Sequence, residues 1–230
     1  MKNNLSIIFF CILILLSCSI FQIVRKVESN VFYSSSLPEI WVRVNPEIEY
    51  IGCAHETINT QAQDGGKYLT VGRDSYFFAK KGSDNTLVQG VIIILSEVNM
   101  RGGYFLPDML SHISNKLISD VINVNTQNYQ RAVTVGAAYI IKYEQDFLMD
   151  KGLIVANCNM SEIFARRLGN NNQNIINILY FESIEKASPG YKCFEWKTPL
   201  TSKQEDLLDE FLKRRKDNVD ILNTAPQKQE

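Results

Sequence analysis

The fold is decided by residues 75–95, which read SYFFAKKGSDNTLVQGVIIIL. An aromatic-rich run ends at Lys80, and the GSDN segment at 82–85 supplies the backbone angles of a tight turn before the chain returns from Leu87. Residues 91–95 are apolar without interruption, so we expect both faces of this segment to be covered. The stretch therefore predicts a β-hairpin whose second strand lies inside a sheet.

Further strands and helices are expected on either side of this hairpin. Alternating or continuous apolar runs predict strands at 40–44, 48–54, 131–143, 153–157 and 175–181. Helices are predicted over 107–124, where Pro107 opens a 3.6-residue apolar period, and over 161–168. A last helix begins at Ser202, with Glu205 completing a capping box.

These elements predict a single domain of the α+β class at residues 39–222. Its sheet is expected to be largely antiparallel, with about 5–7 strands and with helices packed on at least one face. Residues 18–38 are rich in serine and predict a tether, and residues 223–230 predict a flexible tail.

The composition indicates a globular body that carries almost no net charge. The chain has 230 residues, of which 45% are hydrophobic and 10% aromatic, more than a disordered segment contains. Its 24 basic and 25 acidic residues nearly cancel. We therefore expect no nucleic-acid partner, because such partners call for a strong positive field.

The amino terminus has the anatomy of an export signal. Lys2 supplies a positive start, an apolar run extends from Leu5 to Leu16, and the small residue Ser17 follows. Residues 1–17 are therefore expected to be a signal peptide, which places the body of the protein outside the cytoplasm.

The segment Leu15-Leu16-Ser17-Cys18 resembles the lipobox of bacterial lipoproteins, although a residue smaller than Leu16 is more usual there. The resemblance implies that the Cys18 thiol receives a diacylglyceryl group, that the chain is cut before Cys18, and that the new terminus is acylated with a fatty acid such as palmitate. Several acyl chains anchor a protein stably. Ser19, where aspartate would cause inner-membrane retention, implies the outer membrane. The body resembles small exported lipoproteins of unassigned activity.

Two other readings of the leader remain open. The apolar character continues to Val24, so Leu5–Val24 is long enough to be an uncleaved helix in the inner membrane, followed by Arg25 and Lys26. An ordinary signal cut near Ser17 would instead release the domain.

Three cysteines remain in the body after Cys11 and Cys18 are assigned to the leader and the lipid. Cys53 and Cys158 lie in apolar stretches and are expected to be small core residues. Cys193 is the cysteine most expected to form a disulfide, with a partner that the sequence leaves open.

Candidate catalytic and binding residues are few. His55 follows a predicted strand, and with Glu56 or Asp74 it would form a general-base pair. Arg73 is a weak candidate for binding an anion, and Arg166 and Arg167 for binding lipid head groups or peptidoglycan. No metal cluster, nucleotide loop or cofactor motif is found, so neither a metal nor a cofactor is expected.

The leading functional hypothesis is a non-enzymatic envelope lipoprotein, held to the membrane through Cys18, whose domain binds another envelope protein. One alternative is an anchored hydrolase that uses His55 with Glu56 or Asp74. The other is a carrier of a lipid or small ligand, which requires an apolar cavity.

Overall fold

The computed structural model describes residues 24–35, 39–61, 68–99, 110, 113–137, 140–168, 174–187, 193–196 and 198–222. The predicted signal peptide, the proposed lipid site at Cys18 and the predicted tail at 223–230 lie outside these residues.

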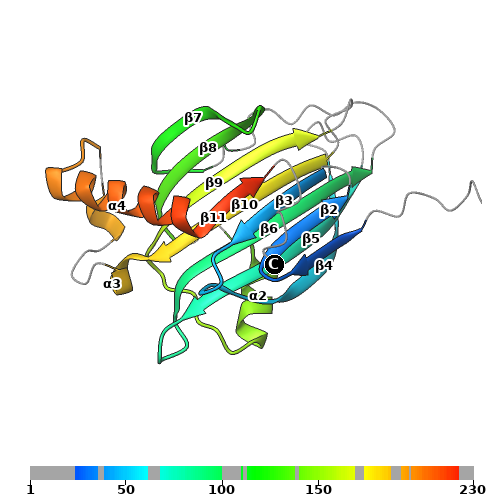
Figure 1. Cartoon of the computed structure of the whole chain (residues 1–230), viewed down its shortest axis with the longest axis horizontal. Helices are drawn as coiled ribbons and strands as arrows, with labels where there is room; N and C mark the ends of the chain where they lie inside the picture. Colours follow the sequence, from blue (N-terminus) through cyan, green and yellow to red (C-terminus); the bar gives the residue numbers. More distant parts are fainter. Residues whose placement is uncertain are drawn as a thin grey trace, which may run out of the picture.

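The larger of two sheets contains seven strands, and every neighbouring pair is antiparallel (Figure 1). The predicted hairpin is confirmed within it, and Asn85 in its turn adopts a positive φ of 60°. In spatial order the strands are β4 (Glu49–Gln61), β5 (Tyr68–Lys81), β6 (Leu87–Asn99), β10 (Asn174–Ser183), β9 (Asn159–Leu168), β8 (Gln127–Gly136) and β7 (Lys116–Val124).

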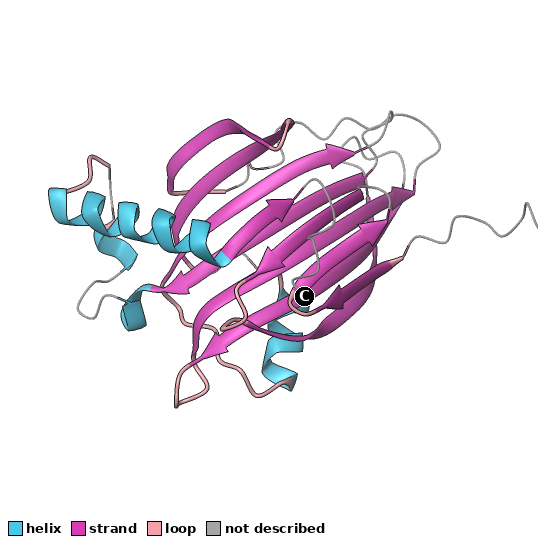
Figure 2. Ribbon diagram, viewed as in Figure 1, coloured by secondary structure: helices cyan, strands magenta, loops and turns pink. Residues whose placement is uncertain are grey.

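A second, four-stranded antiparallel sheet packs on one face of the larger sheet, forming a β-sandwich (Figure 2). The Phe32 ring of the small sheet lies 4.6 Å from the Tyr76 ring of β5. In spatial order its strands are β1 (Arg25–Glu28), β2 (Val31–Ser35), β3 (Glu39–Val44) and β11 (Val219–Leu222).

Both faces of the larger sheet are covered, as the apolar run at 91–95 predicted. Val91, Ile93 and Leu95 belong to the core shared with the small sheet. Ile92 and Ile94 belong to a second core on the opposite face. All five residues are buried, which confirms that β6 is an internal strand.

Three α-helices are described: α2 (Lys142–Asp150), α3 (Ile184–Ala187) and α4 (Ser202–Asn218). Helix α2 covers the face opposite the small sheet, with the Phe147 ring 4.3 Å from the Phe77 ring of β5. Helix α4 packs beside the small sheet, with the Phe211 ring 5.6 Å from the Tyr180 ring of β10. None of these described helices is long and apolar enough to span a membrane.

The predicted α+β class is wrong, because the described structure is mostly β with two sheets. The face expected to carry helices is covered largely by the small sheet, whose strands supply Phe32, Val42 and Val44 to the core. The total number of strands is also larger than the predicted 5–7. Residues 25–35, which were predicted to be part of a tether, form β1 and β2 of this sheet.

Individual elements were also mispredicted. The described end of the predicted helix 107–124 is strand β7, and the predicted helix 161–168 belongs to strand β9. The predicted strand 153–157 contributes only an isolated bridge between Thr86 and Ile154. The last helix is confirmed, although its N-cap is Thr201 and not Ser202.

Candidate functional site

The most prominent polar group outside the cores is the Arg25 cluster, which we define as Arg25, His55, Asp74 and Glu97. His55 of β4 and Asp74 of β5 are direct cross-strand partners, so their side chains share one face of the sheet. His55 Nδ1 lies 2.7 Å from Asp74 Oδ1. Because an ionised carboxylate only accepts hydrogen bonds, Nδ1–H is the donor.

Arg25, the first residue of β1, binds the Asp74 carboxylate of the His55–Asp74 pair and so holds it in place. Its guanidinium donates to Asp74 Oδ2, and its Nη2 lies 2.5 Å from Glu97 Oε1. The Arg25 side chain is only 11% exposed. Burial opposes the charge on Arg25, yet hydrogen bonds to Glu97 and Asp74 raise its pKa above the ordinary value. The cluster thus joins the small sheet to the large one through a permanent cation.

The geometry leaves the second nitrogen of His55 available to solvent. The His55 side chain is 66% exposed, and Nε2 lies 3.5 Å from the Thr57 hydroxyl oxygen. With Nδ1–H held by Asp74, Nε2 carries the free lone pair of the neutral ring. The arrangement can therefore accept a proton, but the Thr57 hydroxyl is at the limit of hydrogen-bond distance.

Glu56, the other carboxylate predicted to serve His55, lies on the opposite face of β4. Its cross-strand partner is Arg73, and Arg73 Nη2 lies 2.6 Å from Glu144 of α2. Glu144 is fully buried, and burial raises its pKa in spite of the charge of Arg73. Arg73 therefore holds α2 against the sheet, which does not favour its predicted role in anion binding.

Arg166 and Arg167 lie near the end of strand β9 and not in a helix. The Arg166 guanidinium lies 5.8 Å from the centre of the Tyr129 ring. Both side chains are half-buried. They are not adjacent to the His55–Asp74 pair in the sheet, because β6 and β10 lie between β5 and β9.

Strand β4 forms one edge of the large sheet and is exposed along one face. The exposed side chains of its described part are Glu49, Tyr50, Cys53, His55, Thr57 and Asn59, of which the last four alternate along one face. The Tyr143 hydroxyl of α2 donates to the His55 carbonyl at 2.6 Å. Cys53 is a free thiol and is exposed, so the prediction that it is a core residue is wrong.

A second polar cluster lies between the large sheet and α4, and it is buried. Glu162 has no exposed side-chain surface and pairs with Arg215 and, at 3.5 Å, with Arg131. Burial raises the pKa of Glu162 in spite of these partners. Glu182 likewise pairs with Arg214 at 2.9 Å. Because both carboxylates are occupied by arginines of the fold, they attach α4 to the sheet.

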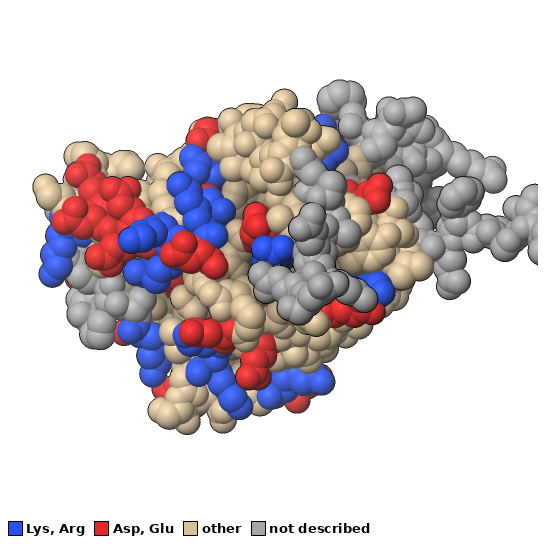
Figure 3. All heavy atoms as spheres, in the orientation of Figure 1, with Lys and Arg blue, Asp and Glu red and all other residues tan. Residues whose placement is uncertain are grey.

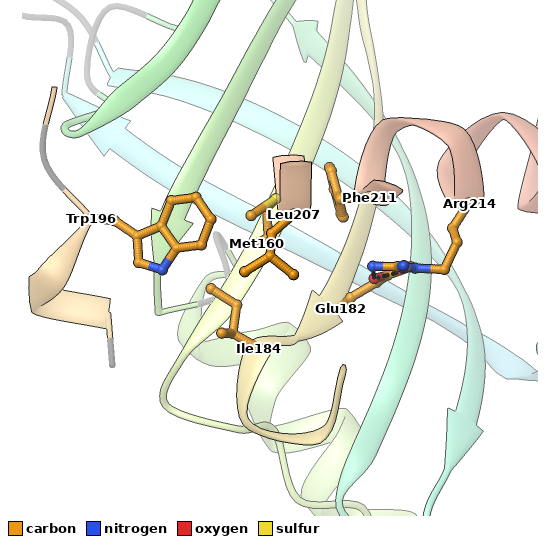
Figure 4. A pocket seen from close by; sticks show the side chains of 7 residues that line it. All are labelled: Met160, Glu182, Ile184, Trp196, Leu207, Phe211 and Arg214. Atoms are coloured by element: carbon orange, nitrogen blue, oxygen red, sulfur yellow. Dashed lines mark hydrogen bonds and ion pairs between the residues drawn. The ribbon is translucent and has the colours of Figure 1, made fainter. Parts of the chain in front are cut away.

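A small pocket adjoins this second cluster, and the Glu182–Arg214 ion pair lies at its wall (Figure 4). The space open to a water-sized sphere is about 20 Å³, which is room for one or two water molecules. This pocket therefore gives no support to the predicted alternative of a ligand carrier. Its lining residues are Met160, Glu182, Ile184, Trp196, Leu207, Phe211 and Arg214.

The disulfide partner that the sequence left open is identified. Cys158 bonds to Cys193 of the short 3₁₀ helix η1 (Cys193–Glu195), with 5.4 Å between their Cα atoms. Cys193 was the cysteine expected to be paired, and that prediction is confirmed. Cys158 is buried, as predicted, but as half of this bond and not as a free core thiol.

Charges on the visible face are mixed in sign, with lysines and arginines interspersed among aspartates and glutamates (Figure 3). Within the described ranges, no group of three or more histidine, cysteine, aspartate or glutamate side chains is arranged to hold a metal ion.

The contacts of Arg25 were not predicted from the sequence. Arg25 was interpreted as the flank of a membrane segment, and its partner Asp74 lies 49 residues away.

Comparison of the chain with protein-family models, with curated proteins and with solved structures finds no match. Any function assigned to it therefore rests on the geometry of its own residues.

Proposed function

We propose that this protein is a lipid-anchored envelope protein whose β-sandwich binds an extended segment of another envelope protein along strand β4. The anchor is the lipid on Cys18, and the outer membrane is the location that Ser19 favours. The observation that carries the binding role is the open edge of β4.

The disulfide supports export of the domain. Bonds such as Cys158–Cys193 form and persist in oxidising compartments and are rare in the cytosol.

The contacts of Val24, just before β1, help to distinguish a cleaved leader from an uncleaved membrane helix. The Val24 backbone already bonds to Ser35, through its N–H to Ser35 Oγ and through its carbonyl to the Ser35 N–H. Val24 is therefore part of the sandwich, which favours cleavage before Cys18 over a helix that continues to Val24.

Strand β4 is the outermost strand of the large sheet, so its backbone groups that point away from β5 have no strand partner among the described residues, and the His55 carbonyl among them accepts from Tyr143. Because Tyr143 donates to the His55 carbonyl from α2, the polar backbone groups of His55 point away from β5. The two-residue period of a strand gives the same direction to Thr57 and Asn59. Unpaired edge groups of this kind bind an added strand, with backbone hydrogen bonds supplying affinity and alternate side chains supplying specificity.

The occupant that fits this edge is an extended polypeptide of the β-augmentation kind. The face on which its alternate side chains would lie is polar and exposed, and it includes His55 and Thr57. A partner segment with hydroxyl or amide side chains would satisfy these groups, because such side chains can donate to His55 Nε2 and can pair with the Thr57 hydroxyl. His55 offers its Nε2 at this position, while Asp74 holds the ring in place.

The test is crosslinking in intact envelopes with two substitutions at one position. Thr57→Pro removes the outward N–H without breaking the ladder to β5, and Thr57→Ala removes the same side chain but keeps the N–H. We expect a specific crosslinked partner with the native chain and with Thr57→Ala, and its loss with Thr57→Pro.

The thermal unfolding midpoint of each variant provides the control, because the proline should be tolerated on an edge strand. Equal capture by both folded variants, or no specific partner for the native chain, would contradict binding through β4.

A second candidate function, an anchored hydrolase, is favoured by the His55–Asp74 hydrogen bond of 2.7 Å. In this reading His55 Nε2 is the general base, Asp74 orients the ring, and Thr57 or a water molecule is deprotonated. Hydrolysis of ester, peptide and glycoside test substrates would be compared in the native chain, His55→Ala and Asp74→Asn. Activity that both substitutions leave unchanged would remove this candidate.

A further inference from the structure

We infer that the end of the sandwich where β1 begins faces the lipid bilayer, while the turn at residues 82–85 points away from it. This inference rests on the membrane anchoring proposed above. It adds an orientation and a lipid-facing surface, neither of which the anchor alone defines.

The length of chain between the anchor and the fold limits the position of the domain. Five residues separate Cys18 from Val24, the first residue held by the fold, so a fully extended tether reaches about 20 Å. Strand β5 has 14 residues and is about 45 Å long. The tether is therefore much shorter than the sandwich, and the start of β1 must lie near the membrane surface.

The tether cannot be lengthened cheaply by releasing β1. Val24 and Ser35 exchange the two hydrogen bonds described above. Arg25 is held by Asp74 and Glu97 in a largely buried position. Pulling Arg25 out would leave two carboxylates without their cation, which opposes fraying at this point.

The start of β1 lies nearer to one end of the large sheet than to the other, although one partner of Arg25, Asp74, is in the middle of β5. Arg25 contacts Glu97, which is two residues before the end of β6, and Val24 contacts the last residue of β2. In Figure 1 the blue strand β1 begins at the right, whereas the turn between β5 and β6 and helices α3 and α4 lie toward the left. A short tether attached nearer to this end favours an orientation in which this end is closer to the membrane than the turn at residues 82–85.

The side chains at the end of the sandwich where β1 begins suit contact with anionic lipid head groups. Arg166 and Arg167 lie within two residues of the end of β9, and the strand partner of Leu168 is Asn174, whose other neighbour is Glu97. Val24, beside the tether, is 45% exposed. Arg166 and Arg167 thus bring positive charge to this end of the large sheet, one on each face, and Val24 brings an exposed apolar side chain beside the tether; both features suit contact with a membrane.

The test places a nitroxide at each end of the β5–β6 hairpin in the acylated protein. Thr70→Cys lies near the start of β5 and Ser83→Cys lies in the turn, and both positions are exposed. The background is Cys53→Ser, because Cys53 is the exposed free thiol and the Cys158–Cys193 bond remains closed. The proteins are reconstituted in phosphatidylethanolamine–phosphatidylglycerol vesicles that contain a nickel-chelating lipid.

We expect relaxation by nickel to be several-fold greater at Thr70→Cys than at Ser83→Cys. Equal relaxation, or more at Ser83→Cys, in a sample whose intact mass shows an acylated Cys18 would overturn the orientation and leave the anchor standing. An intact mass that shows a cut chain without lipid would instead overturn the anchor, and the orientation with it.

Discussion

Arg25 has an effect that its position in the sequence does not suggest. It looks like the charged flank of an apolar leader, yet its guanidinium pairs with both Asp74 and Glu97 and thereby keeps Asp74 in position for His55. One side chain therefore joins the start of the domain, the two sheets and the exposed histidine.

Replacement of Arg25 by alanine is expected to lower the free energy of unfolding by about 1–3 kcal/mol, because two partly buried carboxylates lose their partner. Lys26→Ala is the matched control in the same strand. Lys26 pairs with Glu28, both side chains are exposed, and its loss should cost less than about 1 kcal/mol. Urea denaturation of both variants measures the difference, and equal effects would contradict the role given to Arg25.

Asp84 gives a pH dependence with a defined sign. A hydrogen bond from Lys186, followed by one from the Thr86 N–H, lowers the pKa of Asp84 from 3.8 to about 2. A lowered carboxyl pKa stabilises the fold at pH values above the ordinary pKa, and this contribution is lost as the pH falls from about 4 toward 2.

An NMR titration should accordingly find Asp84 still ionised at pH 3, and Lys186→Ala should move its midpoint back toward 3.8. Lys80→Ala, which removes a lysine that pairs with Glu47, should leave the midpoint unchanged. A normal Asp84 midpoint in the native chain would show that the Lys186 contact does not form in solution.

The partner of His55 was only partly predictable from the sequence. The sequence offered Glu56 and Asp74 as partners for His55 without distinguishing them. Asp74 shares a face with His55 because the β4–β5 register makes them direct partners, and adjacent residues such as His55 and Glu56 point to opposite faces. Register depends on the whole hairpin, so no local pattern reveals it.

At the scale of elements, the contact between β6 and β10 depends on a glycine. A Cβ atom at Gly90 would lie 2.3 Å from Phe181 Cζ and 2.5 Å from its Cε1. Gly90→Ala should therefore cost about 1–3 kcal/mol of stability through overpacking.

Gly72 of β5 is the control for this substitution. A Cβ there has no atom within 4 Å, so Gly72→Ala should change stability by less than about 1 kcal/mol. Adding Phe181→Leu should recover part of the loss in Gly90→Ala. Thermal unfolding tests both expectations, and a neutral Gly90→Ala would show that the strands do not approach as closely as described.

The wrongly predicted helix at residues 161–168 has an identifiable cause. Residues 161–168 show a mixture of apolar and charged side chains that resembles an amphipathic helix, yet most of them are buried in strand β9. Glu162 is tolerated inside because Arg131 and Arg215 come from distant segments. Long-range partners of this kind override local propensity and are invisible to periodicity. The hairpin at 75–95 was predictable because its turn and its apolar run are both local.

At the scale of the whole molecule, the Cys158–Cys193 bond closes a 35-residue separation near α4. Replacing both cysteines by serine should lower the free energy of unfolding by about 2–4 kcal/mol. The mature, unreduced chain should also react with one equivalent of thiol reagent, at Cys53, and Cys53→Ser should not react. Three reactive thiols in the mature chain would contradict the pairing, because an open disulfide adds two thiols to Cys53.

The arrangement in two sheets could not be predicted because the small sheet combines distant parts of the chain. Its strands β1, β2 and β3 come from residues 25–44, and β11 comes from residues 219–222. Four-residue strands such as β1 and β11 are too short to show a period, and they are stable only as parts of a packed sheet. The apolar runs that are visible in the sequence therefore predicted a single sheet. In the structure, a second sheet covers one face of the large sheet.

Intact-mass analysis of the protein purified from its own membranes tests whether a lipid on Cys18 holds this sandwich in the envelope, as we propose. We expect a chain that begins at Cys18 and carries acyl mass, with both features lost in Cys18→Ala. A chain cut near Ser17 without lipid would contradict it. A chain that begins at Met1 would contradict the lipid and assign the anchor to the apolar leader instead.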